Sequence, residues 1–200
     1  THVSTQFAKL GRNSNLRHTV VSLGGDLVRV TPAVELSSPG AEVNMYGVYL
    51  ADSGNYFEHR PYVDHIAPNC VSNVAYKGAL QGAGAHTVWV GDVLIRETAT
   101  GTSTYELNRN LLLTDGARAD SVPNLEIETG KIEGAGHASA SGRFDDEQLF
   151  YLQARGISES EARRLVVRGF LSELIQKVGV AEVEERLIAA VELELEKAGV

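Results

Sequence analysis

Short apolar and β-branched runs fill the first two thirds of the chain, and turn-forming Gly, Asp, Asn and Ser residues separate them. Many short strands with turn signals between them are typical of an all-β architecture. Residues 1–16 are polar and carry no clear pattern. The strongest strand patterns lie at residues 19–21, 27–30, 42–50, 87–90, 93–95, 111–113 and 125–127. We therefore predict an all-β region over residues 16–133.

An internal repeat narrows this prediction to one class of all-β fold. The run His18–Val21, followed by Gly25-Asp26, recurs as His86–Trp89, followed by Gly91-Asp92. This spacing fits three coils of roughly 22 residues each, a length within the range of solenoid repeats. Most of the 20 glycines lie in this region, where they permit sharp corners. We predict a β-solenoid rather than a β-sandwich.

The last third of the chain changes to helical spacing, and two helix starts are encoded locally. Asp145 is placed to cap a first helix, and Gly156 to end it in the left-handed conformation. Ser158 and Glu161 have capping-box spacing at the start of a second helix, which extends to about Lys177. The chain is therefore predicted to switch from strands to helices near residue 142.

Apolar positions give the second helix and a last helix after Gly179 one apolar face each. The end coil of the solenoid, the other helix or another protein could cover these faces. We favour a helical cap on the end coil, because solenoid ends need protection. The predicted organisation is a β-solenoid over residues 1–141 and a small helical subdomain over residues 142–200. The apolar positions of the last helix are Val183, Leu187, Ile188, Val191 and Leu195.

Composition limits the functions open to this chain. A hydrophobic fraction of 43% in 200 residues is enough for a buried core. The net charge of -8, without a basic cluster, argues against nucleic acid as a partner, because binding phosphate needs such a cluster. No apolar run approaches the ~20 residues of a membrane span. With Cys70 as the single cysteine no internal disulfide can form, which favours the cytoplasm. Residue 1 is Thr, so we expect an N-terminal part of the natural chain to be missing.

Two residues are candidates for metal chemistry. His137 lies among small residues, from Gly134 to Ala140, so nothing bulky shields its imidazole from a metal or a partner. Taken alone, this pattern fits a surface histidine better than a ligand. Cys70 is the second candidate, although a lone cysteine is usually an inert, buried thiol.

Other polar groups give weaker signals. His59, Asp64 and His65 are close in sequence, but their spacing matches no closed metal site. Asp145 and Asp146 could be the acid pair of a carbohydrate-cleaving β-helix enzyme, but helix capping already explains them. The sequence contains neither a phosphate-binding Gly-Lys-Ser/Thr loop nor a recognisable Ser/His/Asp arrangement. We therefore expect a non-enzyme that binds no ATP by itself.

Four runs of the sequence match a known family: Pro68–Asn73, Tyr76–Gly78, Gly142–Leu152 and Arg155–Ile157. Through these runs residues 59–171 resemble the SufB/SufD family of iron–sulfur cluster assembly proteins, and the match is looser over the remainder of the chain. The resemblance implies a right-handed parallel β-helix with helical segments at its ends. It also implies a scaffold subunit that works with SufB and the ABC-type ATPase SufC, on which a nascent cluster is built and passed on.

Two positions make the resemblance closer to SufD than to SufB. SufB-type chains carry a cysteine where this chain has Ala117, and a glutamate where it has Ala138. His137 matches the histidine that SufD-type chains contribute at the SufB interface. The resemblance therefore reverses the interpretation of His137. It implies a transient iron–sulfur cluster shared with SufB, with His137 as the metal ligand or cluster-positioning group and Cys70 as a secondary candidate.

The resemblance also implies partners. The second helix is the expected dock for the SufC-like ATPase, through Glu161, Arg164, Leu165 and Arg168. The β-helix edge is expected to pair with a SufB-like paralogue, or with a second copy of this chain when SufB is absent. A structural β-solenoid that only mediates interactions is the alternative, and a β-helix enzyme acting on carbohydrate is a less favoured one.

Overall fold

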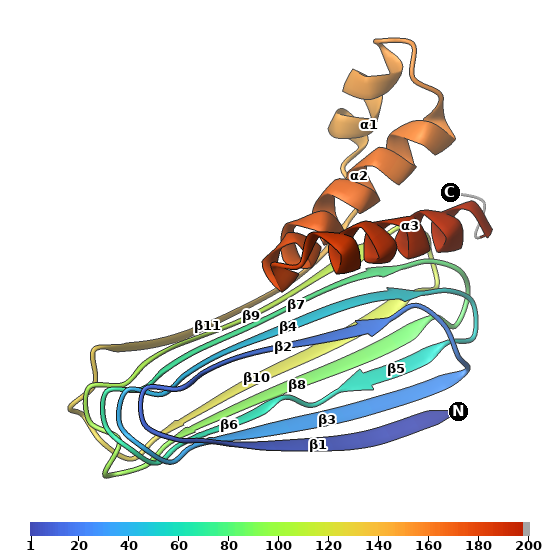
Figure 1. The fold of residues 1–200 in the computed structure, drawn as a ribbon. Coiled ribbons are helices and arrows are strands. Elements are labelled where there is room, and N and C mark those ends of the chain that lie inside the picture. Colours follow the sequence, from blue (N-terminus) through green and yellow to red (C-terminus); the bar gives the residue numbers. More distant parts are fainter. Residues whose placement is uncertain (198–200) are drawn as a thin grey trace.

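The computed structural model describes residues 1–197, apart from the side chain of Asp146. It is a parallel β-solenoid of about five turns followed by helices (Figure 1). Strands make up 48% of the chain, which confirms the predicted fold class. The strands are β1 (His2–Leu10), β2 (Asn15–Ser22), β3 (Leu27–Leu36), β4 (Glu42–Ala51), β5 (Tyr56–His59), β6 (Tyr62–His65), β7 (Val71–Leu80), β8 (His86–Ile95), β9 (Ser103–Leu112), β10 (Arg118–Ile127) and β11 (Gly134–Arg143). The helices are α1 (Asp146–Gln153), α2 (Glu159–Ile175), the short 3-10 helix η1 (Gln176–Val178) and α3 (Ala181–Lys197).

Two parallel sheets form the walls of the solenoid. One has the order β1-β3-β5-β8-β10, with β6 also pairing with β3 and β8, and the other has the order β11-β9-β7-β4-β2. In the second sheet Asn15 lies beside Glu42, Glu42 beside Val71, Val71 beside Ser103 and Ser103 beside Gly134. In the first sheet His2 lies beside Val28, so one coil takes 26 to 32 residues, and the coil length of roughly 22 predicted from solenoid repeats is wrong.

The internal repeat in the sequence is not a repeat of the fold. His18 lies on β2 and His86 on β8, which belong to opposite sheets. Gly25 has a φ of 107° in the turn after β2, whereas Gly91 is buried within β8. Strand-and-turn chemistry is similar at many corners of a solenoid, so short runs resemble each other without occupying equivalent positions.

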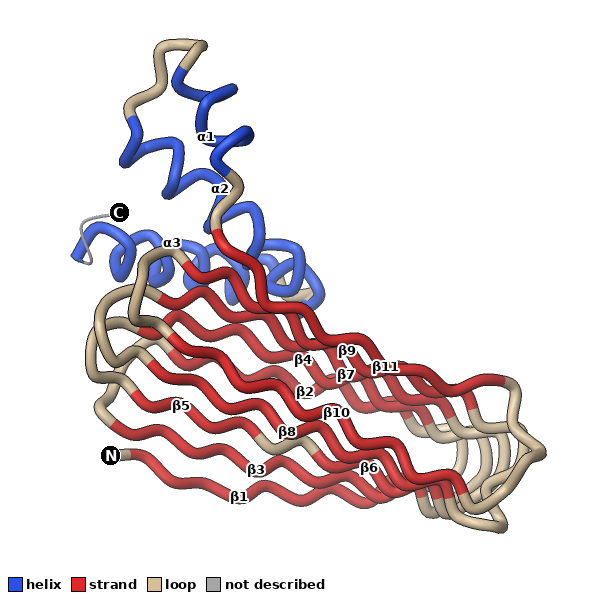
Figure 2. Tube along the Cα trace, turned by 180° about the vertical axis from the view of Figure 1, so that it is seen from behind, coloured by secondary structure: helices blue, strands red, loops and turns tan. Residues whose placement is uncertain are grey.

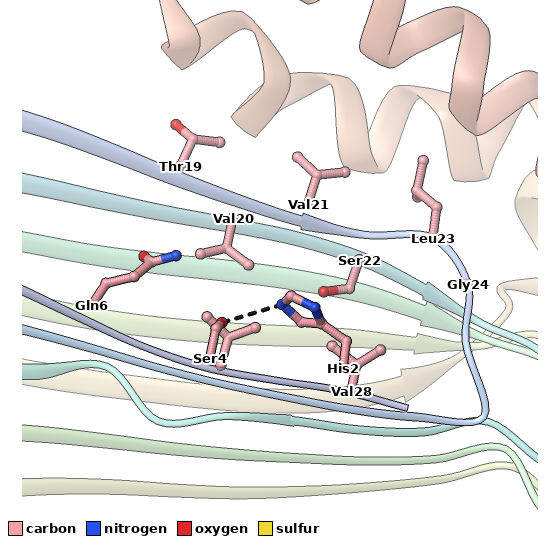
Figure 3. A pocket seen from close by; sticks show the side chains of 11 residues that line it. His2, Ser4, Gln6, Thr19, Val20, Val21, Ser22, Leu23, Gly24 and Val28 are labelled. Carbon is pink, nitrogen blue, oxygen red and sulfur yellow. Dashed lines mark hydrogen bonds between the residues drawn. The ribbon is translucent and has the colours of Figure 1, made fainter.

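Side chains alternate between the interior of the solenoid and its outer surface, as strand geometry requires. Figure 3 shows this on β2 and the residue after it, where Thr19, Val21 and Leu23 point towards the helices and Val20 and Ser22 towards the opposite sheet. Because the coils stack in register, every inward side chain lies beside the inward side chain of the next coil.

Glycine and tyrosine alternate at two neighbouring interior positions. Tyr49 on β4 lies beside Gly78 on β7, and Gly47 lies beside Tyr76. A Cβ atom on Gly78 would lie 1.8 Å from the ring of Tyr49, and one on Gly47 would lie 1.9 Å from the ring of Tyr76. Both tyrosines are fully buried. Each large ring therefore occupies the space that the neighbouring glycine leaves free.

Several strands were not predicted from the sequence. β1 lies in the polar N-terminal stretch, β7 carries the buried Lys77 at an outward position, and β11 begins with small residues, Gly134 to Gly136. These strands lack a simple apolar and polar alternation. β7 nevertheless supplies Val74, Tyr76 and Leu80 to the main hydrophobic core.

The helix ends follow the sequence closely. Asp145 Oδ1 accepts a hydrogen bond from the Glu147 amide at 2.9 Å, and Ser158 Oγ accepts one from the Glu161 amide at 3.4 Å. Gly156 has the predicted left-handed conformation, with a φ of 86°. Among residues 1–197 no helix has the length and apolarity that crossing a membrane requires.

The helices pack on the flank of the solenoid, so the predicted cap on the end coil is wrong. α2 packs chiefly on β7 and β4, and α3 packs on α2 (Figure 1). Outward apolar residues of the strands, among them Val48, Leu50 and Ala79, pack against these helices. The buried residues of this second core are Val48, Leu50, Ala79, Leu113, Val167, Leu171, Leu174, Ile175, Val191 and Leu195.

Lys77 fastens α2 to the sheet. Its side chain is only 2% exposed, and its ammonium donates hydrogen bonds to the Phe170 carbonyl at 3.2 Å and to Glu173 Oε2 at 2.5 Å. The same ammonium lies 4.7 Å from the centre of the Phe170 ring. The hydrogen bond from Lys77 lowers the pKa of Glu173, as expected for an ion pair.

Gly78→Ala tests the interlocking of coils. We expect the added methyl group to lower the free energy of unfolding by about 1–3 kcal/mol, because the ring of Tyr49 has no room to move. Urea unfolding measures this loss. Gly142→Ala is the control, since nothing lies within 4 Å of its Cβ position. Equal stability of the two variants would contradict the interlocked packing.

Lys77→Met tests the attachment of α2. Methionine keeps the apolar stem but loses the charged hydrogen bonds. We therefore expect the free energy of unfolding, measured in urea, to fall by about 2 kcal/mol. Lys131→Met, at an exposed lysine, is the control. A loss of similar size in the control would show that charge in general, and not this contact, is responsible.

Candidate functional site at the last coil

β10 and β11 form the last coil of the solenoid. Each is the outermost strand of its sheet, so one edge of each strand has no strand beside it among the described residues. Figure 2 shows both strands at the same end of the stack. The backbone N–H and C=O groups along these edges are therefore available for pairing.

His137 projects from β11 towards the interior side of this coil. It lies beside Glu106 of β9, a fully buried residue. Ser141 has the same parity on β11, and its hydroxyl accepts a hydrogen bond from the buried Asn110 at 3.3 Å, which identifies this face as the inner one. His137 itself is exposed, because no described coil lies beyond β11. The imidazole thus lies at the mouth of the solenoid interior.

Glu106 is a residue that sequence reasoning missed. Its side chain is 0% exposed, and neither carboxylate oxygen has a hydrogen-bond partner among the described residues. Oε1 lies 2.6 Å from the position that a Cβ on Gly91 would take, so the side chain reaches across the interior to β8. Burial, and secondarily the charge of Asp92, raises the pKa of Glu106 to about 8. The signal in the sequence was the alternation of polar residues at 104, 106, 108 and 110, all of which face inward.

The interior next to this mouth is polar and aromatic. The Tyr49 hydroxyl donates to Asn110 Oδ1 at 2.6 Å and accepts from Asn108 Nδ2 at 2.9 Å. By contrast, Trp89 Nε1 and Ser121 Oγ are buried without a described hydrogen-bond partner. Unpaired buried polar atoms are costly, and others lie elsewhere in the interior, at His18, His59, His65, Tyr76 and Thr87.

Cys70 lies away from the last coil, in the turn before β7. It is fully buried, and its thiol donates to the Ser38 carbonyl at 3.4 Å. Burial raises the pKa of Cys70, which keeps the sulfur in the thiol form at neutral pH. The structure does not bring Cys70 and His137 together into one metal group.

Three further polar residues, His59, Asp64 and His65, each have a different hydrogen-bond partner. His59 shares a hydrogen bond with Ser22 at 3.0 Å, and His65 shares one with Ser72 at 2.8 Å. Asp64 accepts hydrogen bonds from Arg96 at 3.0 and 3.1 Å. Within the described residues no three His, Cys, Asp or Glu side chains gather into a metal site.

The remaining candidates are also placed. Asp145 caps α1, and the side chain of Asp146 lies outside the described part of the structure.

A hollow of about 390 Å³ lies at the opposite end of the solenoid, where His2 shares a hydrogen bond with Ser4 at 3.2 Å (Figure 3). Ser22 lines this hollow too.

The residues expected to meet an ATPase lie on α2. Arg164 pairs with Glu161 on its own helix and with Glu196 of α3 at 3.5 Å, while Arg168 pairs with Glu192 of α3 at 3.2 Å. Leu165 is 39% exposed. α1 stands away from the solenoid (Figure 1) and exposes two aromatic residues that sequence reasoning missed, Phe150 and Tyr151.

Comparison with known proteins identifies the family. A family model described as the SUF system FeS cluster assembly, SufBD core domain, matches residues 1–170. The chain belongs to the SufBD family. This confirms the resemblance found in the sequence, and it places the chain among proteins of iron–sulfur cluster assembly.

The relatives of this SufBD-family chain include mycobacterial and enterobacterial proteins. An iron–sulfur cluster assembly SufBD family protein of Mycobacterium bovis is 62% identical over 201 residues, covering 98% of this chain and 51% of the relative. One from Mycobacterium leprae is 61% identical over 200 residues, covering 97% and 51%. The iron–sulfur cluster assembly protein SufD of Escherichia coli is 25% identical over 169 residues, covering 84% and 40%. The chain thus spans about half the length of the mycobacterial relatives.

His65→Gln tests the buried histidines. Burial lowers the pKa of His65 from 6.5 to about 4, so the unfolded chain takes up a proton first as pH falls. His65 therefore contributes stability above pH 6.5 that is lost as pH falls towards 4. Relative to His65→Gln, we expect the parent protein to lose about 2 kcal/mol in unfolding free energy between pH 7 and pH 5.

The comparison with a variant is needed because Glu106, whose pKa is raised, changes stability in the opposite direction over this range. Urea unfolding at both pH values measures the difference. His2→Gln, at an exposed histidine of the first coil, is the control. We expect it to lose the same unfolding free energy between pH 7 and pH 5 as the parent protein. A constant difference between the parent and His65→Gln would mean that His65 is not buried in the neutral form.

Proposed function

We propose that this chain is a SufD-like, non-catalytic scaffold subunit of a cytoplasmic complex that assembles iron–sulfur clusters. Its partners are a SufB-like paralogue and a SufC-like ABC ATPase. The observation that carries the proposal is the exposed imidazole of His137, held on the inner face of the open last coil. A scaffold needs a ligand at the surface that its partner covers, and His137 meets that condition.

His137 would present a neutral imidazole to iron, or would position a persulfide or cluster ligand. A cluster usually has four protein ligands, and the last coil contributes one exposed imidazole. The cluster is therefore transient and shared, with SufB supplying the thiolate. Ala117 and Ala138 stand where SufB-type chains carry a cysteine and a glutamate, so this chain takes the SufD position.

The two free strand edges give the SufB-like partner its docking surface. Strands of the partner can add to β10 and β11, extending both sheets across the interface. His137 then lies inside the joint, where a cluster is shielded from water. When SufB is absent, the same edges can pair with a second copy of this chain around a twofold axis.

The SufC-like ATPase docks on α1 and α2, and this chain binds no ATP itself. Leu165 and the aromatic residues Phe150 and Tyr151 are exposed on these helices. These residues are surrounded by the charged side chains of Glu161, Arg164 and Arg168. Arg164 and Arg168 also form ion pairs with α3.

ATP-driven dimerisation of two SufC subunits would move the helical ends of SufB and of this chain. The hydrogen bonds of Lys77 join α2 to β7, and β9 separates β7 from β11 in the same sheet. A movement of α2 would therefore be transmitted through β7 and β9 to the last coil. There it would open the interface with the SufB-like partner and release the cluster.

His137→Ala tests this function in the purified complex with the SufB-like and SufC-like partners. We expect the complex to form normally but to hold about tenfold less iron and acid-labile sulfide, because a ligand is lost while the strand edges remain. His2→Ala, an exposed histidine at the other end of the solenoid, is the control and keeps full cluster content.

Two results would count against the proposal. Unchanged cluster content in His137→Ala would leave the chain as a purely structural β-solenoid. Failure of the full chain to bind either partner would remove the SufD-like assignment itself.

A further inference from the structure

We propose that Glu106 and His137 together form a binding site for a divalent transition-metal ion, with ferrous iron as the cargo. The inference rests on the proposed function, because it places iron at the last coil. It goes further in assigning to this chain a second ligand, which lies below the mouth, and in giving the chain a metal site of its own.

The register of the strands brings the two side chains together. His137 and Glu106 are direct partners in the pairing of β11 with β9, and adjacent strands lie about 4.8 Å apart. Both residues have the inward parity, so their side chains leave the sheet on the same side. A carboxylate and an imidazole on neighbouring strands are within reach of one metal ion.

Glu106 is aimed into the site without a partner of its own. It is fully buried, and both of its oxygens lack a hydrogen bond to any described residue. A carboxyl group in this position loses its contacts with water and gains nothing in return. A bound cation would satisfy both oxygens, and this accounts for a glutamate among inward-facing residues.

The opposite wall accommodates the carboxylate end of the site. β8 contributes Gly91 opposite Glu106, and a Cβ atom there would lie 2.6 Å from Oε1 and 2.2 Å from the Trp89 ring, so the missing side chain gives these two groups their space. Next to it, Trp89 Nε1 and Ser121 Oγ are buried without a described partner, and these two residues are neighbours in the pairing of β8 with β10. Their unpaired groups can hold metal-bound water or sulfide.

The chemistry of the ligands selects the class of ion. One imidazole and one carboxylate are nitrogen and oxygen donors that suit ferrous iron and similar divalent ions. Two protein ligands leave several coordination positions open for water, for sulfide or for a thiolate of the partner. The ion is therefore held loosely enough to be passed on.

Cobalt(II) is a suitable probe, because its visible absorption reports coordination by protein ligands. The full chain is titrated with Co²⁺, without any partner, and followed by absorption and calorimetry. We expect one Co²⁺ per chain, and an affinity about tenfold or more lower in both Glu106→Gln and His137→Ala. Glu126→Gln, on the same coil but at an exposed position of β10, is the control and binds as the parent does.

A second measurement reports on the carboxyl group directly. The infrared difference spectrum of the parent, with and without Co²⁺, is expected to show a change in a carboxyl band that is absent from Glu106→Gln. Urea unfolding checks the variant, and we expect no loss of stability because glutamine removes a buried acid without a partner.

The outcomes separate this inference from the proposed function. Equal Co²⁺ affinity of the parent and Glu106→Gln, or no carboxyl band in the parent, would overturn the role of Glu106. His137 could still act as the ligand shared with SufB in that case. Absence of any Co²⁺ binding by the parent would overturn the site as a property of this chain, whereas cluster content in the complex is tested separately.

Discussion

In-register stacking of the coils is the constraint on which the rest of this structure depends. Each interior position lies beside the same position of the next coil, so a side chain has to fit its neighbour in the stack before anything else. Two neighbouring pairs show how closely the side chains fit: Tyr49 lies beside Gly78, and Tyr76 lies beside Gly47. Each tyrosine ring fills the space that the glycine leaves free. The turns absorb the variation in coil length, while the ladder keeps its register. This is why His137 lies directly beside Glu106 and at the mouth of the interior.

The position of the helices decides what the last coil can do. α2 and α3 bury their apolar faces on the flank of one sheet, so they leave the edges of β10 and β11 uncovered. Lys77 nevertheless connects α2 to that sheet from a buried position. Under the proposed function, the helices would bind the ATPase and the strand edges would bind the SufB-like partner, and Lys77 would connect the two surfaces.

Local chemistry made the helical region predictable, whereas the solenoid interior depends on contacts between distant residues. Asp145, Ser158 and Gly156 act at helix ends through neighbours a few residues away, and the structure confirms each of them. The β-solenoid class was also predictable from turns and short strands. The coil length was not, because the repeat that suggested it joins β2 to β8 across two different sheets. Glu106 was missed because inward-facing positions of a strand are expected to be apolar. Only the strand register shows that this glutamate faces the interior.

Hydrogen–deuterium exchange of this chain, with and without a SufB-like partner, tests the central claim that the last coil is the working surface. The outward-facing amides of edge strands exchange quickly when they lack a neighbouring strand. The account predicts that the partner slows exchange in β10 (Arg118–Ile127) and β11 (Gly134–Arg143) more than anywhere else. Protection confined to α1 and α2 or to the first coil, with β10 and β11 unchanged, would contradict it.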